Sequence, residues 1–173
     1  MPRFTTIIHL GFAGLLGWAM AAGVAAGPAA AQDADLRIDV PVVLKEARVV
    51  FNLDHLAFDG DEPIGLNFLH IMTERFRADG TAAKIVAVFH GPNGYMLLND
   101  AAYDRVRHWQ HGNPYKDQIA ALMRAGVEVE ECGQTMRANG WRNADLLPGI
   151  KVNSGANFRI VELVQQGYVQ LQP

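Results

Sequence analysis

The chain has 173 residues, half of them hydrophobic, and its 15 basic and 18 acidic side chains give a formal net charge of −3. This slightly acidic balance argues against nucleic acid or an anionic membrane surface as a partner. A single cysteine, Cys132, excludes a fold that depends on internal disulfides.

The first 31 residues have the composition of a secretory signal peptide. Arg3 gives a basic start, residues 7–26 are apolar and rich in Ala and Gly, and Ala29-Ala30-Ala31 matches a small-residue cleavage site. Cleavage after Ala31 predicts a periplasmic or secreted protein with no further membrane contact. The leader carries one of the 15 basic residues and no acid, so the mature net charge is −4. An uncleaved N-terminal anchor is the alternative, because the apolar run approaches the ~20 residues that span a bilayer.

Residues 32–46 show little periodicity and predict an extended N-terminal arm. A single domain is predicted over residues 47–173. Its first strand is predicted at residues 47–53, where β-forming residues predominate, and an acidic loop follows at residues 54–62. Asp61 before Pro63 is typical of a helix start, and Asp79-Gly80 of a helix end. The buried face of this helix is predicted to comprise Ile64, Phe68, Met72 and Phe76, with Leu69 beside them.

Four more strands are predicted, separated by segments of helical length. Residues 84–89 are apolar throughout, as expected of a central strand covered on both faces. The others are residues 127–131, 150–152 and 168–171. Helices are predicted from Asn113-Pro114 to Gly126, over residues 136–142, and up to Gly167. The last is predicted to be lined by Phe158, Val161, Leu163 and Val164. The β-α alternation predicts an α/β fold with a mostly parallel five-stranded sheet between two helical layers.

Cys132 lies where a predicted strand meets a predicted helix. In open α/β sheets ligands gather at this end of the strands. Free N–H groups in the first turn of the helix favour a thiolate over a thiol. Strand alternation places Glu128, Glu130 and Cys132 on the same face of the strand, which is its polar face. We therefore hypothesise a reactive thiol, the alternative being a small buried side chain.

Several residues near other strand ends are candidates to assist this thiol. His90 follows the central strand and could stabilise or deprotonate it, although a histidine bonded only to the backbone is the alternative. Gln134 and Thr135 could donate hydrogen bonds to a sulfur anion, but Thr135 could equally cap a helix. Ser154-Gly155 could offer N–H groups to an anion, or form a simple cap.

The sequence predicts neither a metal site nor a bound cofactor. His108 and His111 are spaced to share one helical face, but no third ligand follows at a usable distance. No dinucleotide fingerprint, phosphate loop or serine triad is present.

Five short motifs, in order and spacing, resemble the DsrE/DsrF-like family over residues 47–173. They are Val88-Phe89-His90-Gly91, Gly126-Val127 leading to Cys132 and Thr135-Met136, Leu146-Leu147-Pro148-Gly149, Asn153-Ser154-Gly155, and Gln166-Gly167-Tyr168 with Pro173. The resemblance implies a three-layer α/β/α fold, homotrimers or homohexamers, and sulfur relay through a persulfide on a cysteine after the third strand.

Cys132 matches the position of that cysteine, and the first motif adds Gly91 to the candidate site. The family's relay proteins work in the cytoplasm beside sulfurtransferases, whereas this chain has a predicted export signal. Their partners therefore cannot be transferred to it.

The leading hypothesis is a periplasmic sulfane-sulfur carrier acting through Cys132, with a sulfur donor or acceptor protein, or a small sulfur compound, as its partner. The second is a non-catalytic oligomeric module that binds a small ligand or a partner. Thiol–disulfide exchange is the third hypothesis, and it is less favoured because the chain has no second cysteine to resolve a mixed disulfide.

Overall fold

A five-stranded parallel sheet organises residues 36–173, the part of the chain that the computed structural model describes. The strand order is β6-β5-β4-β1-β7, and every neighbouring pair is parallel. The central strands are β1 (Glu46–Leu53), β4 (Ala82–Phe89) and β5 (Glu128–Cys132), and the edges are β6 (Lys151–Asn153) and β7 (Val169–Leu171). The predicted α/β class and the central place of residues 84–89 are confirmed.

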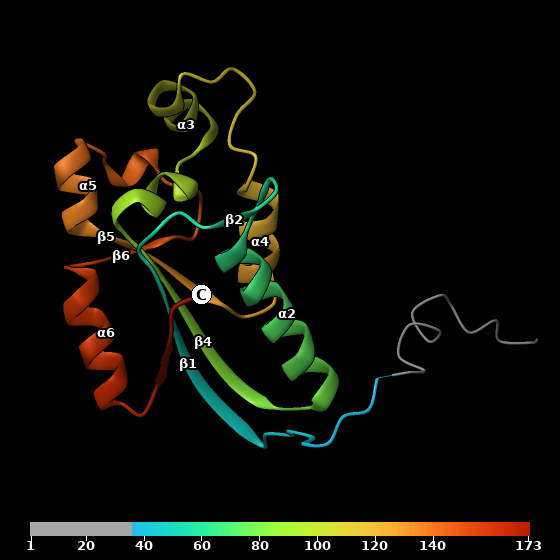
Figure 1. The fold of residues 1–173 in the computed structure, drawn as a ribbon. Helices are drawn as coiled ribbons and strands as arrows, with labels where there is room; N and C mark the ends of the chain where they lie inside the picture. The colour runs from blue at the N-terminus through green and yellow to red at the C-terminus, as the bar shows by residue number, and fades with distance from the viewer. Residues whose placement is uncertain (1–35) are drawn as a thin grey trace, which may run out of the picture. The chain divides into compact units, whose positions relative to one another are not determined.

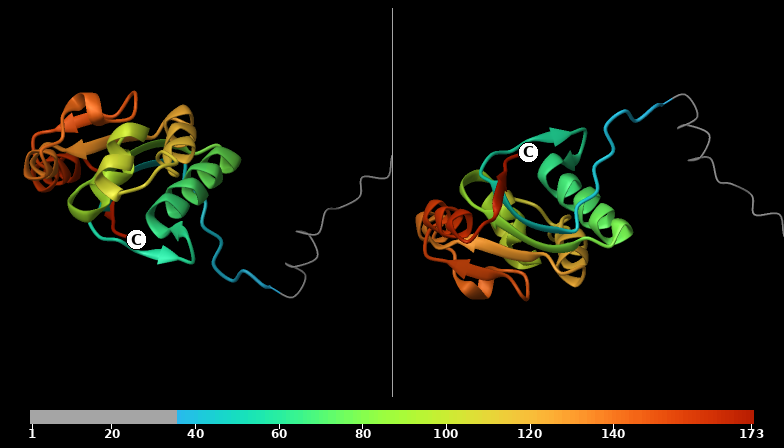
Figure 2. Two further views of the ribbon diagram at one scale, coloured as in Figure 1. Left: turned by 90° about the horizontal axis from the view of Figure 1, so that it is seen from above. Right: turned by 90° about the horizontal axis from the view of Figure 1, so that it is seen from below.

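Helices connect the strands and cover both faces of the sheet (Figures 1 and 2). Helices α2 and α4 lie on one face and α6 on the other, which completes the predicted three layers. The helical elements are α2 (Ile64–Asp79), the 3-10 helix η1 (Gly91–Leu97), α3 (Asp100–Arg107), α4 (Lys116–Arg124), α5 (Gly133–Asn139), the 3-10 helix η2 (Asn143–Asp145) and α6 (Ala156–Gln165).

Two hydrophobic clusters explain why the central strands are apolar without alternation. On β1, Val49 and Phe51 belong to the cluster that includes α2 and α4, whereas Val50 belongs to the cluster with Ile160 and Leu163 of α6. Successive side chains point to opposite faces of a strand, so both sets must be apolar when both faces are covered.

The carboxyl ends of four strands, β1, β4, β5 and β6, lie level with one another at one end of the sheet. Leu53 is paired with Phe89, Phe89 with Glu131, and Cys132 with Asn153. The loops and helices that follow these strands, including η1, α5 and α6, therefore begin near one another.

The predicted faces of two helices were partly wrong. On α2 the buried residues are Leu66, Leu69, Thr73 and Phe76, while Phe68 is exposed. A repeat of four drifts around a helix of about 3.6 residues per turn, so the series from Ile64 to Phe76 cannot stay on one face. On α6 the buried residues are Ala156, Ile160 and Leu163, and the predicted Phe158, Val161 and Val164 are exposed.

Two predicted helix starts also differ. Asp61 lies in the turn of a short antiparallel pair, β2 (Phe58–Asp59) and β3 (Glu62–Pro63), and α2 begins after Pro63 without a side-chain cap. Asn113 is buried before α4, where its side-chain N–H groups bond the carbonyls of Met96 and Leu98 at 2.7 and 2.6 Å. Its Oδ1 also accepts from the N–H of Tyr115 at 2.8 Å, so Asn113 anchors both the end of η1 and the turn that leads into α4.

The predicted signal peptide, residues 1–31, lies outside the described residues. In the predicted arm, residues 36–41 are exposed, and Arg37 and Asp39 form an ion pair at 2.7 Å. Residues 42–173 form a compact unit, and β1 begins at Glu46, one residue before the predicted domain start. No helix within residues 36–173 is long and apolar enough to cross a membrane.

Gly133 lets the first turn of α5 pass close to β6. A Cβ atom at Gly133 would lie 2.7 Å from the backbone oxygen of Asn153, which cannot rotate away. We expect Gly133→Ala to lower the free energy of unfolding by about 1–3 kcal/mol, measured by urea denaturation.

Gly65→Ala in the first turn of α2 is the matched control. Its Cβ would meet only the side chain of Leu53, which can shift. Equal losses of stability in the two variants would contradict the steric role assigned to Gly133.

Candidate strand-end thiol site

The Cys132 sulfur lies where two strand-to-helix connections meet. Cys132 is the last residue of β5 and the cap residue of α5, with φ −74° and ψ 118°. The backbone N–H of Ala156, the first residue of α6, donates to Sγ at 3.3 Å. The sulfur is thus held by the beginning of a second helix, which sequence reasoning did not predict.

Hydrogen bonds and burial act on this thiol in opposite directions. Burial raises the pKa of Cys132, but hydrogen bonding from the backbone N–H groups of Thr135, Ala156 and Gln134 and from the Thr135 hydroxyl outweighs it, so the net effect lowers the pKa. The direction of this effect is the one expected for a strand-end cysteine before a helix.

The thiol is covered rather than open. Cys132 is 4 % exposed and belongs to the cluster formed by Val86, Val88 and Ile160. Strand parity was predicted correctly, because Glu130 also lies on this side, where Arg159 of α6 bonds it at 2.9 Å. The prediction that this face is polar was wrong, since α6 covers it and Glu130 is buried.

Five predicted residues are connected around the sulfur. The N–H of Gly91 donates to Oγ1 of Thr135 at 2.9 Å, which ties η1 to α5. Gln134 donates through Nε2 to the carbonyl of Ser154 at 3.3 Å, which ties α5 to the turn before α6. Gly155 caps α6 and directly precedes Ala156, the donor to Sγ.

His90 is directed toward β1. Its Nε2 lies 2.7 Å from Oδ1 of Asn52. Because β4 separates β1 from β5, this partner lies on the side away from the strand of Cys132. Burial lowers the pKa of His90, partly offset by the charge of Asp54, and the ring is therefore neutral at pH 7.

Glu131 is a notable residue that sequence reasoning did not single out. It is fully buried, and neither of its carboxyl oxygens has a hydrogen-bond partner among the described residues. Alternation could have found it, because Val127, Val129 and Glu131 share the apolar face of β5.

The environment of Glu131 favours its protonated form. Burial, reinforced by the neighbouring Cys132, raises its pKa to about 9. A Cβ atom at Gly94 would lie 2.7 Å from Oε1 and 2.9 Å from Cγ2 of Thr135, so η1 packs directly on this carboxyl. Thr135 thus contacts both sides of the site, with its methyl group near the acid and its hydroxyl near the thiol.

The two histidines considered as metal ligands, His108 and His111, do not share one helical face. His108 ends α3 with a left-handed φ of 52°, and the ring of His111 lies 5.1 Å from that of Trp109. Within residues 36–173, no group of three or more His, Cys, Asp or Glu side chains is arranged to hold a metal ion.

A parallel five-stranded sheet between helical layers, with a hydrogen-bonded thiol at the strand ends, defines a three-layer α/β/α protein with a candidate thiol site. The model of the DsrE/DsrF-like family matches residues 47–173, and the chain belongs to that family.

The chain is similar to solved structures, and the first of those described here shares its fold. The protein of unknown function MTH1491 from Methanobacterium thermoautotrophicum has 25% sequence identity and a TM-score of 0.55, over 73% of this chain and 99% of that one. The ychN protein from E. coli has 14% identity and a TM-score of 0.46, over 74% and 99%. No curated protein matches the chain.

Protonation of Glu131 predicts an unusual pH dependence of stability. Its pKa is about 9 in the folded protein and 4.5 without these surroundings, so folding retains a proton that the unfolded chain releases. Stability should therefore fall as pH rises between these values, by up to about 1.4 kcal/mol per pH unit. Glu131→Gln should remove this slope and raise the melting temperature at pH 8, measured by thermal unfolding across this range.

Glu130→Gln is the matched control, because it removes the ion pair with Arg159. We expect it to lower stability without abolishing the slope. An identical slope in the wild type and in Glu131→Gln would show that this carboxyl does not retain the proton.

Proposed function

We propose that this protein carries sulfane sulfur as a persulfide on Cys132, in the periplasm. One observation carries the proposal: at the strand ends, the Ala156 N–H donates to the sulfur while neighbouring donors lower the thiol pKa. Membership of the DsrE/DsrF-like family supports it, because sulfur relay is what the sequence resemblance implies.

The chemistry requires only the thiolate and a donor with a sulfur–sulfur bond. The Cys132 thiolate attacks the terminal sulfur of a polysulfide or persulfide, and a new sulfur–sulfur bond forms at Sγ. The donor's sulfur–sulfur bond breaks, and its remaining sulfur leaves with the electron pair. Delivery to an acceptor thiolate reverses these roles. Neither step requires a metal or an external redox partner.

Access to the sulfur requires local movement, since Cys132 is buried. The turn at residues 153–155 precedes the Sγ donor and is held to α5 by the bond between Gln134 and Ser154. Ser154 is exposed and lines a shallow groove with Phe158 and Arg159. We infer that this turn moves when a donor approaches.

Burial of the thiol also favours a second candidate, a non-catalytic oligomeric module that binds a small ligand or a partner. A free cysteine packed against valines commonly serves only to fill space. In this case Cys132→Ser would leave ligand binding and assembly unchanged.

Sulfur loading separates the two candidates. After incubation of the purified protein with polysulfide, intact mass spectrometry should show the gain of one or more sulfur atoms, removed by a reducing agent. Cys132→Ser should gain none. Absence of uptake by the wild type, or equal uptake by the variant, would eliminate the carrier function.

Loss of the Thr135 hydroxyl should make the thiol less reactive. Thr135→Val removes one group that lowers the pKa of Cys132. We therefore expect alkylation by iodoacetamide at neutral pH to slow by about threefold to tenfold, and the pH–rate profile to move to higher pH.

Thr73→Val is the control, because that hydroxyl bonds the carbonyl of Leu69 on α2 at 2.6 Å, far along the chain from the thiol. If both variants react as fast as the wild type, Thr135 does not stabilise the thiolate.

A further inference from the structure

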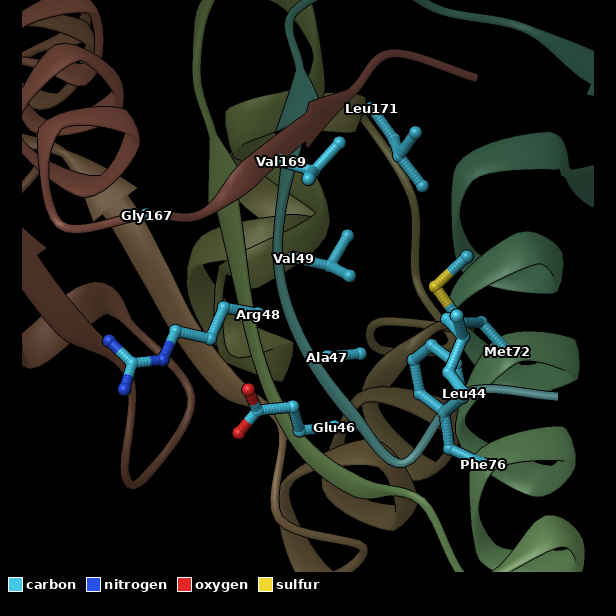
Figure 3. A pocket seen from close by; sticks show the side chains of 10 residues that line it. All are labelled: Leu44, Glu46, Ala47, Arg48, Val49, Met72, Phe76, Gly167, Val169 and Leu171. Carbon is cyan, nitrogen blue, oxygen red and sulfur yellow. The ribbon is translucent and has the colours of Figure 1, made fainter.

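An apolar groove of about 550 Å³ lies beside the edge strand β7 (Figure 3). Its walls come from the first half of β1, from β7 and from the second half of α2, and Leu44, just before β1, also lines it. Figure 3 shows Val49, Val169 and Leu171 directed toward the side of the sheet that holds Met72 and Phe76. Val169 is 62% exposed, which is unusual for a β-branched residue in a strand beside a hydrophobic core.

The outer edge of β7 has no partner within the described part of the chain. Its sequence, Val169-Gln170-Leu171, pairs with β1 on one side only. It carries no charge and no proline, the devices that usually protect an edge from strand addition. A free edge beside an apolar groove is suited to an added strand with one apolar face.

The N-terminal arm has that pattern. From Leu36 to Val42 every second side chain is apolar, and the positions between them are Arg37, Asp39 and Pro41. This period of two predicts a strand with one apolar face, and it ends at Val43, which is apolar as well. The prediction that residues 32–46 have little periodicity missed this alternation. The apolar side chains of this pattern are between 62% and 78% exposed: Leu36, Ile38, Val40 and Val42.

The path of the chain into β1 disfavours pairing of the arm with β7 of the same molecule. The Leu44 carbonyl accepts a hydrogen bond from the Thr81 hydroxyl at 2.8 Å, and the Lys45 carbonyl accepts one from the Ala82 N–H at 3.0 Å. These bonds hold the chain on the β4 side of β1, whereas β7 lies on the other side. The arm would have to double back across β1, a constraint that an arm from another molecule does not have.

We propose that residues 36–42 of one copy add as a strand to β7 of a second copy, with their apolar side chains in the groove beside that copy's own Leu44. Seven extended residues span about 23 Å, enough to reach between subunits. Pro41 is compatible with an outer strand because it needs no ladder N–H on its free side.

Disulfide trapping tests this exchange. In a Cys132→Ser background, Val169→Cys is combined with Val40→Cys or, separately, with Val42→Cys in the full chain. Mild oxidation should give disulfide-linked dimers or longer species on non-reducing gels. Mixing the two single variants should give a mixed dimer, identified by mass.

The matched control places the second cysteine at Val164, an exposed valine on α6. An intramolecular bond between arm and β7 would overturn the proposal, as would cross-linking no faster than in the control.

Assembly provides a second, independent measurement. Val169→Glu should lower the mass measured by light scattering, because it places a charge in the groove, whereas Val164→Glu should not. A monomeric wild type, or equal masses for the two variants, would overturn the exchange. Sulfur uptake by Val169→Glu should equal that of the wild type, so failure of this proposal is distinguishable from failure of the carrier function.

Discussion

The register between β5 and β6 is the constraint on which the thiol site depends. Because Cys132 is paired with Asn153, the two strands end at the same level, and the helices that follow start side by side. The first N–H of α6 can then reach the sulfur that caps α5. A shift by one residue would turn the thiol to the opposite face of the sheet and remove that donor.

The last two residues of β5 meet opposite environments. Cys132 faces the beginning of α6 and receives hydrogen bonds, whereas the carboxyl group of Glu131 faces the cluster beneath η1 and receives none from the described residues. A negative charge is stabilised at the first position and penalised at the second. The neutral carboxyl lets the thiol ionise without an adjacent like charge, so the position of the proton on Glu131 is part of the electrostatics of the sulfur.

Features determined by local sequence could be predicted, and those determined by contacts between distant segments could not. Apolar runs and turn residues predict the five strands, the alternation of strands with helices along the chain, and the position of Cys132 at a strand end. The donation from Ala156 and the cover over the thiol depend on how α6 packs. The partner of His90 depends on which strand neighbours β4, which the sequence does not specify. Glu131 could have been found by extending the alternation of Val127 and Val129 by one residue.

The two unusual regions of the molecule lie toward opposite edges of the sheet. Cys132 is on β5, next to the edge strand β6, whereas the groove lies beside β7, the edge strand at the other side of the sheet. A strand added at β7 would therefore occupy neither the turn at residues 153–155 nor η1. The same sheet can therefore hold subunits together at one edge and leave the strand ends near the other edge free for chemistry. Assembly through the groove would thus not need to cover the sulfur.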